Sequence, residues 1–232
     1  MNPRVRFWKF LNSKDAKQIR DTEPIKVAHI LTDVHIGGAG RYLINLLRYL
    51  DPQQFQSVVL CPAGGQLERE LQQLQQLQKS QQQHLQQRQS QQPQQLGIRL
   101  VTYPQAKGDR SLDWSMIWWF YQTLRREKPQ VVHTHASLSG RLAARLAGIP
   151  VSVMTRHWSL PTPASAATTA SVAPGSLGRV RQRIGSWINA VLSDAVIAVS
   201  QALGEQLVAA GLPKEKVWVI HNGINVEEPV SD

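Results

Sequence analysis

The stretch IKVAHIL at residues 25–31, with GGAG at 37–40 and the segment 41–50 behind it, decides the fold class of this chain. The first is a short apolar run of strand-forming residues, and the last has the apolar spacing of a helix. Further strands are predicted at 57–61, 98–103, 130–134, 151–155, 195–199 and 217–220, and helices from residue 66 and over 112–127, 138–147, 177–192 and 201–210. This alternation predicts an α/β fold: a doubly wound, Rossmann-like parallel sheet of about seven strands with helices on both faces.

Three histidines follow neighbouring predicted strands. His133 and His135 lie at the end of the 130–134 strand, and His157 lies just past the 151–155 strand. Ligands bind beyond the carboxyl ends of the strands in such a sheet, and residues at i and i+2 point to the same side. We interpret these imidazoles as hydrogen-bonding groups for phosphate or sugar hydroxyls. A zinc site is the less favoured alternative, because no carboxylate lies near them in the sequence.

A glycine-rich turn, Gly37-Gly38-Ala39-Gly40-Arg41, joins the first strand to the first helix. Glycines here would let backbone N–H groups approach an anion at the helix N-terminus. The dinucleotide-binding fingerprint is excluded, because Leu43 stands where its third glycine should be. The turn is therefore either an anion site or a purely geometric turn. Arg41 and Arg156 supply positive charge suited to phosphate.

The composition of the chain limits the kinds of partner and the compartment that we expect. The chain has 232 residues, a net charge of +10 and one cysteine, Cys61, which excludes an internal disulfide and fits a reducing compartment. The charge favours anionic partners, but no nucleic-acid-binding motif is present, so we expect no nucleic acid. Nothing resembles a secretory leader or a membrane span, so we expect a cytoplasmic protein.

Several segments lie outside the strand–helix order. Residues 1–24 form a basic lead-in that could contact a membrane. Residues 72–95 contain 15 Gln in 24 positions, and we expect a surface insertion without core-forming content that could extend the preceding helix. The composition of residues 159–176 predicts a mobile loop, which is either plain disorder or a lid.

Trp114 and Trp118 share one face of the helix predicted over 112–127. This face either packs in the core or forms an aromatic patch for a membrane or partner.

Taken together, the motifs resemble a known family. They are IKVAHIL at 25–31, GGAGR at 37–41, VVHTH at 131–135, TRH at 155–157, AVIAVS at 195–200 and VIHNGIN at 219–225. In this order they resemble the N-terminal domain of family 4 glycosyltransferases over about residues 25–226. These are retaining enzymes built from two Rossmann-like domains, the GT-B architecture.

The resemblance implies a function and a site. The domain 25–226 would hold the acceptor, while a C-terminal domain would hold most of the nucleotide-sugar donor. His157 would be the catalytic residue, close to the transferred sugar, and no cofactor or metal would be needed. The implied substrate-binding residues are Gly37, Gly38, Ala39, Gly40, Arg41, His133, His135, Arg156, Ser200, Asn222 and Gly223.

The resemblance also implies an incomplete enzyme. Residues 227–232 would begin the linker to a second domain that this sequence lacks, so we expect the chain alone to transfer no sugar. The alternative is a non-catalytic relic or a glycan- or glycolipid-binding module. The expected partners are a nucleotide-sugar donor, a sugar or lipid-linked acceptor, and an anionic membrane surface. The membrane would be contacted by the lead-in, the Trp114 helix and the arginines at 179–183, which would make the protein peripheral to the cytoplasmic membrane face.

Overall fold

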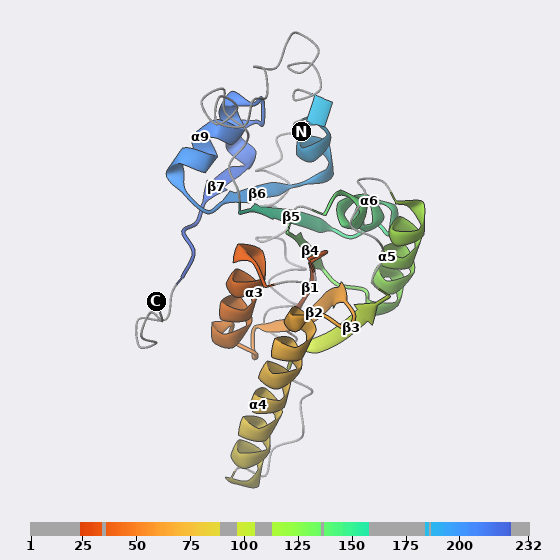
Figure 1. Cartoon of the computed structure of the whole chain (residues 1–232), viewed down its shortest axis with the longest axis vertical. Coiled ribbons are helices and arrows are strands. Elements are labelled where there is room, and N and C mark those ends of the chain that lie inside the picture. The colour runs from red at the N-terminus through yellow and green to blue at the C-terminus, as the bar shows by residue number, and fades with distance from the viewer. Residues whose placement is uncertain are drawn as a thin grey trace.

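A computed structural model describes residues 24–33, 36–88, 97–104, 113–135, 137–157, 184–185 and 187–223, with only the backbone for 81–88. Its centre is a seven-stranded sheet in the order β3-β2-β1-β4-β5-β6-β7, in which every neighbouring pair is parallel (Figure 1). The strands are β1 Ile25–Ile30, β2 Phe55–Pro62, β3 Arg99–Tyr103, β4 Val131–Thr134, β5 Val151–Arg156, β6 Ala195–Ala198 and β7 Val217–Val219. The predicted doubly wound parallel sheet is confirmed.

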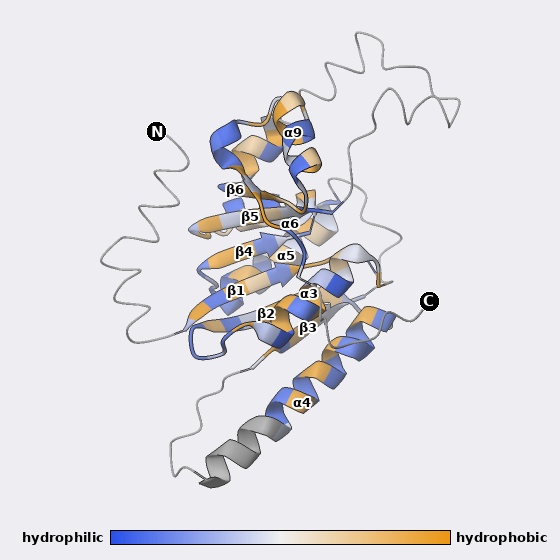
Figure 2. Cartoon of the chain, turned by 90° about the vertical axis from the view of Figure 1, so that its left-hand side faces the viewer, coloured by the Kyte–Doolittle hydropathy of each residue, from blue (hydrophilic) through white to orange (hydrophobic). Residues whose placement is uncertain are grey.

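Helices cover both faces of the sheet. Figure 1 shows α3 (Gly38–Tyr49) and α4 (Gln66–Arg88) on one side, and α5 (Trp114–Glu127) and α6 (Leu138–Leu146) on the other. Helix α9 (Gln201–Ala209) and the 3-10 turn η1 (Lys214–Lys216) lie between β6 and β7 in the chain. Residues 184–185 and 187–192 are also helical. Figure 2 shows the sheet from another side, with α4 extending past its edge.

Alternation along the strands separates two cores. Ala28 and Ile30 of β1 pack with α5 and α6, whereas Val59 of β2 packs with α3 and α4. Cys61, which is fully buried, belongs to the second core. His29 of β1 alternates with Ala28 and Ile30, so its side chain points to the α3 side of the sheet. The histidine face is therefore set by strand periodicity.

Helix starts differ in a way that concerns the site. Asp113, Ser137 and Ser200 each accept a hydrogen bond from a backbone N–H of the helix that they begin, which satisfies donors that would otherwise lack a partner. Gly37, which begins α3, makes no such side-chain cap, and the first turn of α3 holds no acidic residue. Among the described residues, no side-chain cap is therefore found at the start of α3, which makes its first N–H groups candidates for an external acceptor.

Close packing brings α6 against β1. A Cβ on Gly140 would lie 3.0 Å from Cδ1 of Ile30 and 3.2 Å from Ser137 Oγ, so a side chain here would push the helix away from the strand. Since α6 directly follows the β4 histidines, this contact fixes the turn in which His135 lies.

The glutamine-rich segment departs in part from expectation. Helix α4 runs through it as far as Arg88. Leu74 is 7% exposed and belongs to the α3–α4 core. Gln75 Nε2 donates to Ile98 O at 2.6 Å, and Gln78 Nε2 donates to Leu47 O at 3.1 Å. The expectation that this segment contributes nothing to the core is wrong for its first two turns.

Some sequence-based expectations fall outside the structure. The lead-in up to residue 23, the loop 159–176 and the residues 227–232 lie outside the described ranges. Within those ranges, no helix combines the length and the apolar character that a bilayer span requires.

Candidate functional site

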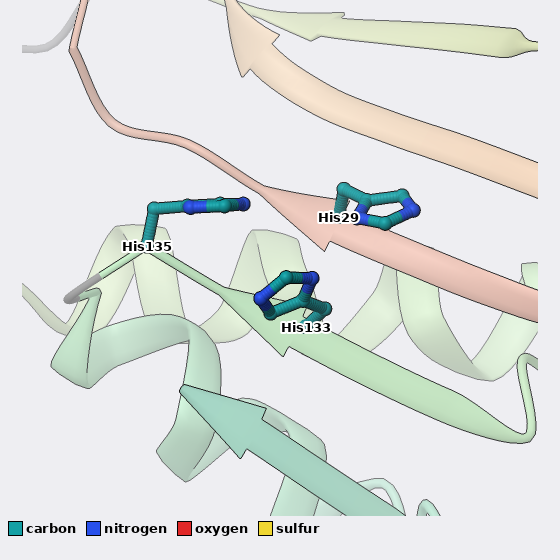
Figure 3. A group of neighbouring side chains, drawn as sticks. All are labelled: His29, His133 and His135. Atoms are coloured by element: carbon teal, nitrogen blue, oxygen red, sulfur yellow. The ribbon is translucent and has the colours of Figure 1, made fainter. Parts of the chain in front are cut away.

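Four histidines meet at the carboxyl edge of the sheet. His29 comes from β1, His133 from β4, His135 follows β4, and His157 follows β5. The ring centroids of His29 and His133 are 5.3 Å apart, those of His133 and His135 are 4.5 Å apart, and those of His135 and His157 are 5.2 Å apart. Figure 3 shows the first three of these rings gathered beside the ends of β1 and β4. The register explains the cluster, since His29 is the cross-strand partner of His133.

Two hydrogen bonds fix the rings. His133 Nε2 lies 2.7 Å from Thr155 Oγ1 of β5, and His135 Nδ1 lies 2.9 Å from His157 Nε2. The outer nitrogens of the second pair, His135 Nε2 and His157 Nδ1, are buried without a hydrogen-bond partner among the described residues. Buried polar atoms are normally paired, so unpaired atoms at a strand edge point to a polar ligand.

Burial keeps these imidazoles neutral. It lowers the pKa of His133 to about 4, and it lowers the pKa of His29 and of His135 well below 6.5, in each case helped by the neighbouring histidines. Burial also lowers the pKa of His157, although the Asp33 carboxylate acts in the opposite direction. At neutral pH each ring therefore carries one N–H donor and one acceptor nitrogen.

The His135–His157 pair has a property that does not depend on the tautomer. If His135 Nδ1 carries the proton, His157 Nδ1 is a donor and His135 Nε2 an acceptor. If His157 Nε2 carries the proton, these two outer roles are exchanged. In either case the pair presents one donor and one acceptor at separate positions, and two hydroxyls of a sugar, each both a donor and an acceptor, can satisfy them.

Tyr42 lies over the histidines from α3. Its ring centroid is 5.1 Å from that of His157 and 5.7 Å from that of His135. Burial raises the pKa of the Tyr42 phenol, and a hydrogen bond with Thr155 acts in the opposite direction. Because Tyr42 lies about one turn into α3, the open start of that helix is next to the histidine cluster.

The predicted glycine-rich turn thus lies beside the predicted histidines. Gly37 and Gly38 are exposed, and a Cβ on either would meet nothing within 4 Å. Neither residue has a positive φ. The exposed Arg41 lies in the same first turn of the helix. Space and backbone strain therefore do not account for glycine here, and anion binding at this helix N-terminus stays a prediction.

The remaining predicted residues are more dispersed. Asn222 and Gly223 are exposed after β7, and Gly223 O accepts a hydrogen bond from Asn45 Nδ2 of α3 at 3.5 Å. Arg156 is half-buried at the end of β5, and burial lowers its pKa. Ser200 Oγ accepts from Leu203 N at 3.3 Å as the cap of α9. Substrate contact by these residues stays a prediction.

Sequence reasoning missed four side chains of this site. His29, Tyr42, Thr155 and Asp33 were not among its expected site residues. A signal for His29 was present, because the first and fourth strands of a doubly wound sheet are neighbours and both carry a histidine near their ends. Tyr42 could have been found one turn into the glycine-rich helix. The effect of Asp33 on His157 crosses between strand ends, and no sequence spacing indicates it.

The donor set also admits a metal. One nitrogen from each of His29, His133 and His135 lies within 4.8 Å of the others. Neutral imidazole is a zinc ligand, so three converging rings could accept a zinc ion after small side-chain movements. This trio differs from the predicted one, which had His157 in place of His29.

Comparisons with known proteins place the chain. It is 28% identical over 138 residues to the Escherichia coli UDP-Gal:alpha-D-GlcNAc-diphosphoundecaprenol alpha-1,3-galactosyltransferase, an alignment that covers 57% of this chain and 30% of the relative. The structure of Anabaena HepE in complex with UDP and glucose matches with a TM-score of 0.58 at 18% identity, over 87% of this chain and 45% of that one. The lipopolysaccharide outer core galactosyltransferase WaaB matches with a TM-score of 0.52 at 14% identity, over 88% of this chain and 47% of that one.

The matches show how much of each relative this chain covers. The chain spans less than half the length of each of these proteins, and its fold corresponds to half of a GT-B fold. The two structural matches are below 25% identity and so concern the fold alone. Residues 36–228 match Glycosyltransferase Family 4, which confirms the family expected from the motifs: the chain belongs to Glycosyltransferase Family 4.

Proposed function

We propose that this chain is the acceptor-side domain of a retaining hexosyltransferase and that the histidine edge binds the acceptor sugar. The observation that carries the proposal is the His135–His157 hydrogen bond of 2.9 Å, whose two outer nitrogens are buried and unpaired. An acceptor sugar with one hydroxyl at each of these nitrogens would satisfy both. His157 is the less buried member of the pair, so it is the one that we assign beside the reacting hydroxyl.

The start of α3 is suited to stabilise the departing diphosphate. Transfer breaks the bond between the anomeric carbon and the diphosphate oxygen and forms a bond to the acceptor oxygen, whose hydroxyl proton passes to the departing diphosphate. The negative charge that develops on the departing nucleoside diphosphate would face the uncapped N–H groups behind Gly37, with Arg41 in the same turn. The positive end of a helix stabilises such charge without any reorganisation.

The names of the relatives support a proposal for the substrate class. The Escherichia coli relative is named for a UDP-Gal donor and a diphosphoundecaprenol-linked acceptor, and HepE was crystallised with UDP and glucose. We therefore propose a UDP-hexose donor and a lipid-linked acceptor for this chain. A lipid-linked acceptor would place the protein at the cytoplasmic face of a membrane.

Binding of the acceptor to this chain tests the proposal. Titration with GlcNAc-diphosphoundecaprenol in detergent micelles, followed by calorimetry, should show saturable binding. His157→Ala should weaken the affinity about tenfold, because a buried hydrogen bond to the sugar is lost. Gln122→Ala, at an exposed position on α5, is the matched control and should leave the affinity unchanged. Equal affinities of the wild type and the His157 variant would contradict the proposed site.

Two further arms separate the alternatives. EDTA should leave acceptor binding unchanged, whereas loss of binding that zinc restores would favour the metal reading of His29, His133 and His135. Addition of UDP-galactose to the bound complex, with thin-layer analysis of the lipid, tests for transfer. Binding without transfer, even with a donor-binding domain supplied, would favour a non-catalytic glycolipid-binding module.

A further inference from the structure

Large apolar side chains gather on the outer surface of α5 and α6. Trp114 is 74% exposed, Trp118 is 59% exposed and Leu146 is 59% exposed. With Tyr121 and the edge of Ile117 they line a shallow hollow of about 300 Å³. We call the four of these residues that reach the surface, Trp114, Trp118, Tyr121 and Leu146, the aromatic surface. The alternative that Trp114 and Trp118 pack in the core is wrong, because the core side of α5 is filled by other residues.

The aromatic surface is held rigidly. On the inner side of α5, Phe120 and Leu124 are fully buried, and Ile117 is 3% exposed. On the outer side, the rings of Trp118 and Tyr121 stack with centroids 5.3 Å apart and planes 22° from parallel. The indoles are therefore exposed on a well-packed helix. Contiguous exposed apolar side chains of this size mark a contact surface.

Positive charge continues the same stripe. Trp114, Trp118, Tyr121 and Arg125 follow one another at spacings of four, three and four residues, which places them along one helix face. Arg125, Arg126 and Lys128 are all exposed at the end of α5. The chain as a whole carries a net charge of +10. An aromatic surface that ends in cations is complementary to lipid headgroups above acyl chains.

A second apolar stripe belongs to the same helical layer. Arg141 Nη1 of α6 donates to Asn189 Oδ1 at 2.6 Å, which places the helical residues 187–192 beside α6. On this helix Ile184, Trp187 and Val191 are 52%, 65% and 51% exposed. The spacing of four residues puts Trp187 and Val191 on one face. Exposed indoles thus lie on both sides of α6.

We propose that the aromatic surface docks the protein onto an anionic lipid membrane. Trp and Tyr favour the bilayer interface, and the arginines at the end of α5 favour anionic headgroups. Trp114 begins the helix that follows β3, so it lies at the carboxyl edge of the sheet, the edge that holds the histidines. Docking there would bring a lipid-linked acceptor toward the cluster. This orientation rests on the proposed function, whereas membrane binding itself does not.

Vesicle flotation without donor or acceptor tests the docking. The full chain should float with vesicles of phosphatidylcholine mixed with phosphatidylglycerol, and much less with phosphatidylcholine alone. The double variant Trp114→Ser/Trp118→Ser should lower partitioning about tenfold or more, because two interfacial indoles are removed. Arg125→Gln and Arg126→Gln should each lower it about fivefold at low salt.

The matched controls lie on the opposite face of the sheet. Leu77→Ser replaces a side chain on α4 that is 62% exposed, and Lys79→Gln removes an exposed cation from the same helix. Both should float like the wild type. Equal flotation of the double variant and the wild type would overturn the proposal. A second result would also overturn it. If the chain formed a dimer without lipid, seen by sedimentation, and the double variant abolished that dimer, the surface would bind a second copy of the chain.

Discussion

The histidine edge and the aromatic surface depart from ordinary protein surfaces in opposite directions. At the edge, polar rings are buried: His29, His133 and His135 are 2%, 6% and 4% exposed. On α5, apolar rings are exposed: Trp114 and Trp118 show 74% and 59% of their surface. Buried unpaired polar groups and exposed apolar clusters are both unusual and both costly in water. We therefore propose a ligand for each region, a polar one inside and an apolar one outside.

The two regions also differ in what holds them. The rings at the edge come from neighbouring strands, and cross-strand register brings them together. The rings on the surface come chiefly from a single helix and share a face through sequence spacing alone. Changes at the edge should therefore affect folding as well as binding, whereas changes on the surface should affect binding only. The predictions below test that contrast.

The largest predicted effect is a loss of folding stability in acid, caused by protonation at the histidine edge. His133 titrates at about pH 4 in the fold, against an ordinary pKa of 6.5. Between these values the unfolded chain binds more protons than the folded chain, so the free energy of unfolding falls as the pH falls. From pH 7 to pH 5 we expect His133 alone to cost about 2 kcal/mol, measured by urea denaturation.

The variant His133→Asn isolates this contribution. It removes the titrating group while the other histidines stay, so its free energy of unfolding should fall by about 2 kcal/mol less over the same pH range. Its stability at pH 7 is expected to be lower than that of the wild type, which does not affect the comparison of slopes. If both proteins lose the same amount, His133 is not buried in its neutral form.

A single hydroxyl provides the next test. Thr155 is fully buried, and its Oγ1 lies 2.7 Å from His133 Nε2. Thr155→Val keeps the shape of the side chain but leaves the imidazole without that partner, so we expect a loss of about 1 kcal/mol or more in the free energy of unfolding.

Thr102→Val is the matched control, because Thr102 lies in β3 and is exposed. Its stability should stay within about 0.5 kcal/mol of the wild type. If the two variants were equally stable, the hydrogen bond at the histidine edge would contribute nothing measurable to folding.

The smallest effect is expected on the aromatic surface. Trp114→Ser and Trp118→Ser each replace a side chain that is mostly exposed, so the free energy of unfolding should change by less than about 0.5 kcal/mol. If either variant unfolded the protein, the indoles would contribute to folding, and the contrast between the aromatic surface and the histidine edge would be wrong. Thermal denaturation by circular dichroism is sufficient for this measurement.

Much of the fold could be predicted from the sequence, because each strand is a short apolar run followed by a helical one. The strand at 25–31 and the helix at 201–210 were predicted to within one residue of β1 and α9. Prediction was less accurate where side chains act beyond their own element. The glutamines of α4 were taken for an inert insertion, yet Gln75 and Gln78 donate to backbone carbonyls of other elements. Composition does not indicate such contacts.

The site could be predicted only in part. His133, His135 and His157 were expected from their places at strand ends, and the structure brings them together. Their pairing and their neutrality come from burial and register, which spacing does not give. Tyr42 joins them only because α3 packs back over the sheet. For Trp114 and Trp118 the sequence left core and surface open, and the buried Phe120 and Leu124 decide between them.

Cys61, the single cysteine, has a consequence for labelling experiments. Its thiol lies fully buried in β2, and burial together with Glu68 raises its pKa to about 12. A thiol in that state is nearly inert to maleimide at neutral pH. A cysteine introduced at the exposed Lys79 would therefore react alone, and no native cysteine would have to be replaced first. The wild-type chain is already a suitable background for attaching one fluorophore or spin label at a chosen surface position.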